Sequence, residues 1–300
     1  MSSVISVPRE NVAAGIGWML FTGLWFVTMD TVGKYLLQSY PVMQVVWCRF
    51  LLHLLIALAV ALIWFRDTLR SNRPWAQLGR SALLAVTTVL FYIGLATSDL
   101  ATATTIMFMS PIFVTILSVP LLGESVGIRR MAGVLVGFLG AVIVVRPGIA
   151  PISTGMLCLL ASASTNALFQ ISTRYLRHHD KPMTTSLYTA LAGTILLSAT
   201  GPFHWQTPDT QGWALLVALG FIGGMGQLCL IRALRLAPPA AIAPFSYASI
   251  VWATVFSLTV FGQVPSVWTL AGATLIIGSG LYIFRRERAA ARAEIMAEPT

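Results

Sequence analysis

LLGESVGIRRMAGVLVGFLGAVIVVRPG, residues 121–148, decides the fold together with VFGQVPSVWTLAGATLIIGSGLYI, residues 260–283, because the two stretches are versions of one segment. Gly123 aligns with Gly262 at a shift of 139 residues. Other pairs recur at a shift of 139 or 140 residues: Ala132-Gly133 with Ala271-Gly272, Leu95 with Leu234, Ala101 with Ala240, Gly15 with Gly155, and Lys34-Tyr35-Leu36 with Arg174-Tyr175-Leu176. This common offset over most of the chain indicates the duplication of one unit.

Both copies lie in a strongly apolar chain. Of its 300 residues 57% are hydrophobic and 10% are charged, and the mean hydropathy is +0.81. Soluble domains average about 25% charged residues. A helix needs roughly 20 apolar residues to cross about 30 Å of hydrocarbon, so we expect an all-α polytopic membrane protein. Its ten predicted spans are residues 12–35, 42–64, 81–98, 101–122, 131–147, 154–174, 184–203, 212–231, 239–261 and 265–284.

The two copies are predicted to be inverted. Each holds about five spans, and an odd number obliges the second copy to enter the membrane from the opposite side. We expect one five-helix repeat at residues 12–147 and another at 154–284, with residues 1–11 and 285–300 as cytoplasmic ends. Inverted repeats usually place a substrate site near the bilayer midplane and work by alternating access. The pattern therefore predicts a carrier.

The net charge of +9 describes topology. If the N-terminus is cytoplasmic, nearly all the basic residues fall in cytoplasmic links and ends, whereas Lys34 and Arg146 fall on the other side and Arg49 lies within a span. This asymmetry follows the positive-inside rule, and an even number of spans then places both termini in the cytoplasm. The charge therefore gives no reason to expect nucleic acid as a partner.

The two quoted stretches, together with RALRLAPPAAIAPFSY at residues 232–247, resemble the EamA family of the drug/metabolite transporter superfamily from about residue 12 to 284. The resemblance implies ten helices, a bacterial-type inner membrane and secondary transport of small organic metabolites, often amino acids or their derivatives. MDTVGKYL and YPVMQVVWCRF, residues 29–36 and 40–50, also resemble members that carry riboflavin or S-adenosylmethionine. We expect export of a small polar amino-acid-derived metabolite. The alternative is uptake of a vitamin or nucleoside-like compound such as riboflavin or S-adenosylmethionine.

Charged residues within the spans are candidates for the substrate or proton pathway. Asp30 lies about seven residues before the hairpin QSYP, residues 38–41, and Arg49 about eight after it, so both sit roughly 10 Å below the turn at about 1.5 Å rise per residue. His53 shares a helix face with Arg49. Intramembrane charges usually pair in the bundle interior and mark function. The trio would hold a zwitterion or a coupling proton; the alternative is a static bridge fastening the first two helices, with His53 as a packing residue.

Polar and aromatic residues at mid-span complete the predicted cavity, because small-molecule sites combine apolar walls with a few hydrogen-bonding groups. Each of them would serve equally well for packing between helices. They are Trp25, Tyr92, Asn166, Gln170, Gln227, Tyr247 and Trp252. Pro111 and Pro244, at related places in the two copies, are predicted to kink their helices, because proline removes a backbone donor.

Other functional classes find little support. The chain has no H-E-x-x-H and no G-x-S-x-G motif, and His178-His179-Asp180 lies in a short basic link without a fourth metal ligand. Cys48, Cys158 and Cys229 fall within spans and are expected to be inert. We therefore expect no enzyme, metal or cofactor. The expected partners are a small-molecule substrate and the lipid bilayer, with coupling protons and a second copy of the chain left open.

Overall fold

The computed structural model describes residues 11–64, 71–122, 128–145, 153–176, 180, 182–237 and 242–297. The first half contains α1 (Val12–Leu36), α2 (Val42–Trp64), α3 (Pro74–Thr97), α4 (Leu100–Met107), α5 (Ser110–Leu122) and α6 (Ile128–Val145). The second contains α7 (Thr154–Leu176), α8 (Pro182–Ser198), η2 (Gly201–His204), α9 (Thr210–Leu236), η3 (Ala243–Tyr247), α11 (Ala248–Phe261) and α12 (Val267–Ala297). The described chain has no strands, and the predicted all-α architecture is confirmed.

Six helices are long and apolar enough to cross a membrane among the described residues. These candidate spans lie at Val12–Leu36, Val42–Ala59, Pro74–Thr97, Leu100–Leu117, Thr154–Thr173 and Thr210–Leu230. Shorter apolar helices occur at Met131–Val145, Phe245–Phe261 and Val267–Tyr282. α12 continues as far as Ala297, so most of the predicted tail extends the last helix. The first ten residues, expected to form a cytoplasmic N-terminus, lie outside the described residues.

Helix ends are set by local chemistry. Asn11, Asp99 and Asp209 precede α1, α4 and α9, and their side chains accept hydrogen bonds from backbone N–H groups of the first turns at 3.0, 2.7 and 2.7 Å. Such caps satisfy donors that have no partner within the helix. Gly262 ends α11 with φ 63°, a left-handed conformation that glycine adopts without steric cost. These signals position the short links between the spans.

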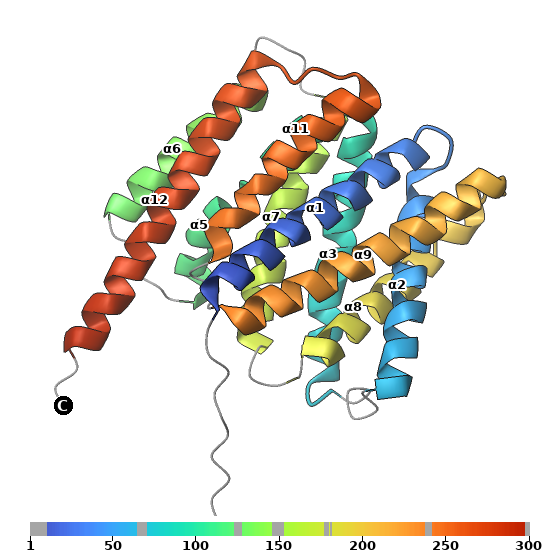
Figure 1. Cartoon of the computed structure of the whole chain (residues 1–300), viewed down its shortest axis with the longest axis horizontal. Coiled ribbons are helices and arrows are strands. Elements are labelled where there is room, and N and C mark those ends of the chain that lie inside the picture. The colour runs from blue at the N-terminus through green and yellow to red at the C-terminus, as the bar shows by residue number, and fades with distance from the viewer. Residues whose placement is uncertain are drawn as a thin grey trace, which may run out of the picture.

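The two halves pack against each other through helices that are equivalent in the repeat. α1 packs against α9, and α3 packs against α7; α2 faces α8, and α6 lies along α12. The helices α7, α8 and α9 correspond to α1, α2 and α3 in the repeat. The contact of α1 with α9 is therefore equivalent to that of α7 with α3, and the contact of α2 with α8 is equivalent to itself. Figure 1 shows α1 and α9 running side by side and α6 running beside α12 at one edge of the bundle. This packing is the arrangement expected of inverted repeats.

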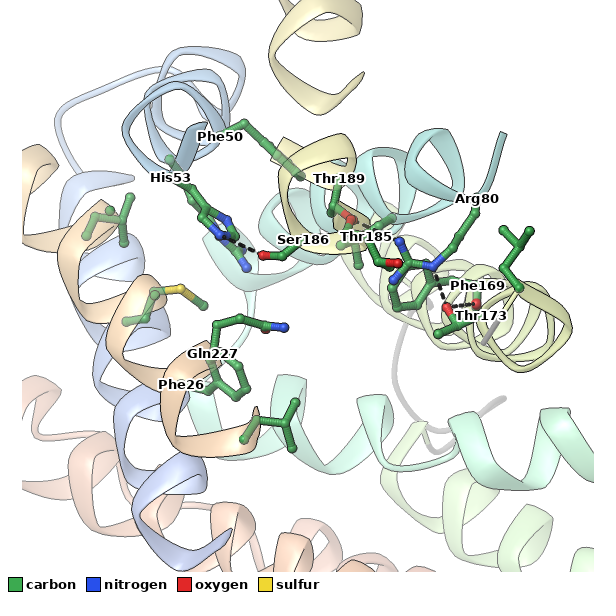
Figure 2. A pocket seen from close by; sticks show the side chains of 18 of the residues that line it. Phe26, Phe50, His53, Arg80, Phe169, Thr173, Thr185, Ser186, Thr189 and Gln227 are labelled. Carbon is green, nitrogen blue, oxygen red and sulfur yellow. Dashed lines mark hydrogen bonds between the residues drawn. The ribbon is translucent and has the colours of Figure 1, made fainter. Parts of the chain in front are cut away.

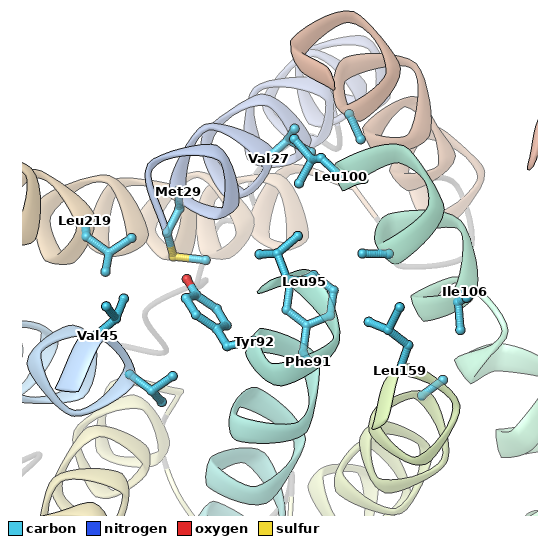
Figure 3. Close-up of a cluster of buried hydrophobic side chains, with 14 of the residues drawn as sticks. Val27, Met29, Val45, Phe91, Tyr92, Leu95, Leu100, Ile106, Leu159 and Leu219 are labelled. Carbon is cyan, nitrogen blue, oxygen red and sulfur yellow. The ribbon is translucent and has the colours of Figure 1, made fainter. Parts of the chain in front are cut away.

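Small residues permit the close crossings. A Cβ added to Gly15 in α1 would lie 2.5 Å from the Cβ of Ala237 just after α9. A Cβ added to Gly155 in α7 would collide with Oγ1 of Thr97 in α3. Gly15 and Gly155 are equivalent in the repeat, so the same device serves both crossings. The interior between them is filled by fully buried residues such as Tyr92, Leu95 and Leu219 (Figure 3).

Candidate binding cavity between the two halves

A cavity of about 600 Å³ lies between the halves. Residues of α1, α2 and α3 line it from one half, and residues of α7, α8 and α9, with Asp180 from the link after α7, line it from the other. The lining residues are Phe26, Met29, Arg49, Phe50, His53, Arg80, Leu84, Phe169, Thr173, Leu176, Asp180, Thr185, Ser186, Thr189, Leu219, Gly220, Gly223, Gln227 and Leu230. Its walls are thus formed by the equivalent first three long helices of each half.

Arg80, in the second turn of α3, is a buried charge in the wall of the cavity. Only 7% of the residue is exposed. Its Nε donates to Oγ1 of Thr173 at 2.6 Å and its Nη1 to Oγ1 of Thr189 at 2.9 Å, while its guanidinium carbon lies 4.4 Å from the ring centroid of Phe169. Figure 2 shows Arg80 reaching across from α3 toward these α7 and α8 side chains. One arginine of the first half is therefore held by the second half.

Arg49 lies on the α2 wall. Its guanidinium carbon is 5.5 Å from the ring centroid of Tyr92, so a cation–π contact links α2 to α3. Asp30 lies near enough for an electrostatic interaction with Arg49, although no direct hydrogen bond or ion pair between the two occurs in the described part of the chain. Tyr92 is fully buried, and its ring packs against Gly33, one turn after Asp30. The predicted pair is therefore a looser group of Asp30, Tyr92 and Arg49.

His53 and Gln227 add hydrogen-bonding groups to the cavity. His53 Nε2 lies 3.5 Å from Oγ of Ser186, which spans the cavity from α2 to α8. Gln227 enters from α9, close to Phe26 of α1 (Figure 2). Phe26, Phe50 and Phe169 give the cavity aromatic surfaces. An elongated solute with a flat apolar part and polar groups would be complementary to these walls.

A set of hydrogen bonds at one end of the cavity joins the halves. Asp180 accepts from Oγ of Ser71 at 2.5 Å, from the backbone N–H of Asn72 at 2.8 Å and from Nε2 of Gln77 at 2.8 Å. The same Nε2 donates to Oγ1 of Thr185 at 3.1 Å. These residues, which we name the Asp180 lock, tie the start of α3 to the α7–α8 link.

A second set lies at the opposite ends of the helices. The Tyr40 hydroxyl donates to Oδ1 of Asp209 at 3.1 Å. Gln44 exchanges two hydrogen bonds with the backbone of Gln206, from its Nε2 to the carbonyl at 2.7 Å and to its Oε1 from the N–H at 2.9 Å. We name these residues the Gln44 lock. Tyr40 and Asp180 are 140 residues apart and occupy equivalent links of the two halves, so the two locks are related by the repeat.

The structure brings together three of the predicted site residues, Arg49, His53 and Gln227, in the cavity wall. Asn166 and Gln170 instead donate to Oγ of Ser110 at 3.1 and 2.9 Å. The remaining candidates lie outside the wall: Trp25 near Gly226 of α9, Asp30 and Tyr92 behind Arg49, Tyr247 with its ring centroid 5.0 Å from that of Phe108, and Trp252 with its Nε1 buried.

The two prolines lie beside breaks in their helices. α4 ends at Met107 and α5 begins at Ser110, so Pro111 falls in the first turn of α5 and not in the middle of one continuous helix. Pro244 falls at the start of the 3-10 turn η3, which precedes α11. A proline in a first turn leaves no additional backbone donor unsatisfied. Both spans are therefore divided into two pieces at equivalent places.

Sequence patterns overlooked the Arg80 cluster. The predicted span begins at residue 81 and so leaves Arg80 in the preceding link, whereas α3 begins at Pro74. Four hydroxyl-bearing residues of the wall have no sequence signal that distinguishes them from ordinary helix residues: Thr173, Thr185, Ser186 and Thr189. Lys34 is buried and donates to the carbonyl of Ser98. His178 and His179 lie outside the described residues, and no group of three metal-ligating side chains occurs among those described.

A ten-span bundle of two inverted halves with a cavity between them defines a multi-pass membrane carrier. The chain belongs to the EamA-like transporter family, whose model matches residues 13–146 and again 153–285. The matches coincide with the two halves of the structure. The family assignment suggested by the sequence is therefore confirmed.

Curated relatives cover nearly the whole chain. An S-adenosylmethionine uptake transporter of Rickettsia bellii is 28% identical over 281 residues, which are 94% of this chain and 97% of the relative. A riboflavin transporter of Vibrio cholerae is 27% identical, with 95% and 98% covered. A pseudopaline exporter of Pseudomonas aeruginosa is 26% identical, with 93% and 99% covered. A solved crystal structure with 20% identity matches 95% of this chain and 99% of its own at a TM-score of 0.61, which supports the fold.

Proposed function

We propose that this protein is a secondary transporter that takes up a small nucleoside-like or amino-acid-derived metabolite through the cavity between its halves. The observation that carries the proposal is the cavity itself, which combines three phenylalanine rings with arginine, histidine and glutamine side chains drawn from both halves. Such a mixture of flat apolar walls and a few polar groups is typical of small-molecule sites.

The relatives support this substrate class. One is named for S-adenosylmethionine, which joins an amino acid to a nucleoside, and another for riboflavin, which carries a flat ring system. Uptake is stated in the name of the S-adenosylmethionine relative. Export, the direction expected from the sequence alone, is the second candidate and is supported by the pseudopaline exporter.

Alternating access would use the two locks in turn. Each lock joins the first half to the second, and the two lie at opposite ends of the helices that line the cavity. Opening the cavity at one end requires the hydrogen bonds of that lock to break, while the other lock keeps its end closed. Because the repeat relates the locks, the two open states would resemble each other with the halves exchanged.

A bacterial inner membrane with both termini in the cytoplasm agrees with the charge distribution. The end of the bundle at which α1 begins is also the end at which α9 finishes, since the N–H of Asn11 donates to the carbonyl of Leu236 at 3.0 Å. Arg232 and Arg235 lie in the last two turns of α9, at this end. By the positive-inside rule this end faces the cytoplasm.

The test compares metabolites inside and outside cells that overproduce the protein. The inactive comparison is Ser186→Trp, which fills the cavity, and its matched control is Thr259→Trp on an exposed position of α11. Uptake predicts that S-adenosylmethionine or riboflavin disappears from the medium in cells with the wild type or Thr259→Trp but not with Ser186→Trp. Accumulation outside the cells would establish export, and identical profiles for all three would exclude the cavity as the route.

A further inference from the structure

The guanidinium of Arg80 is a buried cation whose charge has no carboxylate partner among the described residues. Its partners in the described part of the chain are two hydroxyl groups and one aromatic ring. Removing an ion from water costs several kcal/mol unless an opposite charge and hydrogen bonds compensate. Neutral hydroxyls and a ring offset only part of that cost. A bound anion would therefore stabilise the buried charge of Arg80.

The two threonines hold Arg80 as hydrogen-bond acceptors. The hydroxyl of Thr173 donates to the carbonyl of Phe169 at 2.7 Å, and the hydroxyl of Thr189 donates to the carbonyl of Thr185 at 2.7 Å. A hydroxyl has one proton, so with that proton on the helix backbone each oxygen turns its lone pairs to Arg80. The guanidinium carbon also lies over the ring of Phe169. Position and plane of the guanidinium are thus both fixed before any solute arrives.

Arg80 keeps donors for a ligand. A guanidinium carries five N–H groups in a planar fork, and the contacts with Thr173 and Thr189 use one on Nε and one on Nη1. Arg80 lines the cavity, so the remaining donors lie where a bound solute would reach them. A planar fork of this kind matches the two oxygens of a carboxylate.

The carboxylate of Asp180, which also lines the cavity, is engaged in hydrogen bonds with other residues. Its oxygens accept hydrogen bonds from Ser71, Asn72 and Gln77, which belong to the lock at the end of the cavity. Within the described part of the chain, the contacts of Arg80 are with Thr173, Thr189 and Phe169. The compensating charge must therefore come from outside the described protein.

We propose that Arg80 binds the carboxylate of the transported solute, so that the protein selects metabolites that carry this group. The inference rests on the proposed function and narrows its substrate class. S-adenosylmethionine has an amino-acid carboxylate, whereas riboflavin has none. Arg80 thus favours the former class over the latter, with the flat part of the solute toward the phenylalanine rings.

The experiment measures transport in proteoliposomes with three probes: S-adenosylmethionine, its decarboxylated analogue and riboflavin. The wild type is compared with Arg80→Gln and with Arg73→Gln. Arg73 is the N-cap residue of α3, where it is exposed and contacts Tyr175, so the second variant is a matched control. For the wild type and Arg73→Gln, kcat/KM is expected to be at least tenfold higher for S-adenosylmethionine than for the decarboxylated analogue. Arg80→Gln is expected to erase that preference through a raised KM for the carboxylate compound alone.

Two further variants keep the test decisive if Arg80→Gln does not fold. Arg80→Lys retains the charge without the fork, and Thr189→Val removes one acceptor of Arg80, so both are expected to reduce the preference for the carboxylate compound severalfold. A folded Arg80 variant that keeps the full preference would overturn the role of Arg80, as would equal uptake of riboflavin and S-adenosylmethionine by the wild type. Uptake of none of the three probes by the wild type would overturn the proposed function and this inference with it.

Discussion

Gly33 of α1 packs directly against Tyr92 of α3. A Cβ added to Gly33 would lie 2.6 Å from Oη, 2.8 Å from Cε1 and 2.9 Å from Cζ of Tyr92. The tyrosine is fully buried and points toward Met29 (Figure 3), so its ring has little space into which to move. We predict that Gly33→Ala lowers the free energy of unfolding by about 1–3 kcal/mol, the usual cost of overpacking.

Gly17 provides the control on the same helix. No atom lies within 4 Å of a Cβ added at Gly17, so Gly17→Ala is expected to leave the melting temperature unchanged or to raise it slightly, since alanine favours a helix. Thermal unfolding of the purified variants in one detergent gives the comparison. Equal melting temperatures for the two variants would contradict the close packing of Tyr92 on α1.

The hydroxyl of Tyr92 invites a second test. Its Oη is buried without a hydrogen-bond partner among the described residues, and such a group costs about 1–3 kcal/mol. Tyr92→Phe removes the hydroxyl but keeps the ring on which Arg49 lies. We therefore expect unchanged or higher thermal stability and unchanged uptake. A large loss of uptake by a stable Tyr92→Phe protein would show instead that the hydroxyl acts on the solute or on a bound water.

Position within a span decided which cavity residues could be predicted. Arg49 and His53 lie deep in an apolar run, where a polar side chain stands out and is costly unless it faces the interior. Arg80 lies at the edge of its run, and a long side chain there is indistinguishable from one that reaches toward the lipid headgroups. Its burial depends on Thr173 and Thr189 from two distant helices. Such a tertiary arrangement leaves no local signal.

At the level of the elements, the contact between α6 and α12 depends on glycine. A Cβ added to Gly272 would lie 2.5 Å from the carbonyl oxygen of Gly140 and would collide with the side chain of Val144. Backbone cannot move aside as a flexible side chain can. We predict that Gly272→Ala reduces the yield of folded protein several-fold, whereas Gly278→Ala, with no atom within 4 Å of the added Cβ, does not.

Size-exclusion chromatography of the two α12 variants, expressed in parallel, would measure that yield. Comparable monodisperse peaks would contradict a backbone-to-backbone crossing. The two glycines lie on one helix and receive the same substitution, so differences in helix propensity cancel. A difference in yield between the two variants would then reflect the close approach of α6 to α12.

Helices were more predictable than their interruptions. Apolar length alone located the ten spans, because a membrane leaves the backbone few alternatives to a continuous helix. The gap between α4 and α5 and the 3-10 turn η3 needed the structure, even though Pro111 and Pro244 lie beside them. Proline marks the neighbourhood of a break, but the packing of the surrounding helices decides on which residue it falls.

At the scale of the whole molecule, the repeat accounts for the positions of the two locks as well as for the fold. The duplication was readable from a constant offset, and exchange of the halves maps Tyr40 onto Asp180. Those residues take part in the two locks through different chemistry: a phenol donates to Asp209, whereas a carboxylate accepts from Ser71 and its neighbours. Aligned sequences do not reveal this equivalence, because it lies in the position of the contact and not in the residue type.

The two locks allow a prediction about the direction in which the cavity opens. A net hydrogen bond contributes about 0.5–1.5 kcal/mol, and bonds to a charged group contribute more. Asp180→Ala and Gln44→Ala each remove two or more bonds that join the halves at one end. Each change should therefore favour, at least severalfold, the state that is open at its own end.

Reaction of a cysteine in the cavity with a membrane-impermeant thiol reagent would show this bias. The probe is Ser186→Cys in a protein whose Cys48, Cys158 and Cys229 have been replaced, and vesicles of both orientations present the two ends separately. Asp180→Ala should accelerate labelling from the side of the α7–α8 link and Gln44→Ala from the opposite side, with Gln263→Ala, at an exposed glutamine before α12, as the control. Faster labelling from opposite sides in the two variants would show that each lock closes its own end of the cavity. If both variants accelerated labelling from the same side, the locks would not act as alternating gates, because a single opening motion would then account for both.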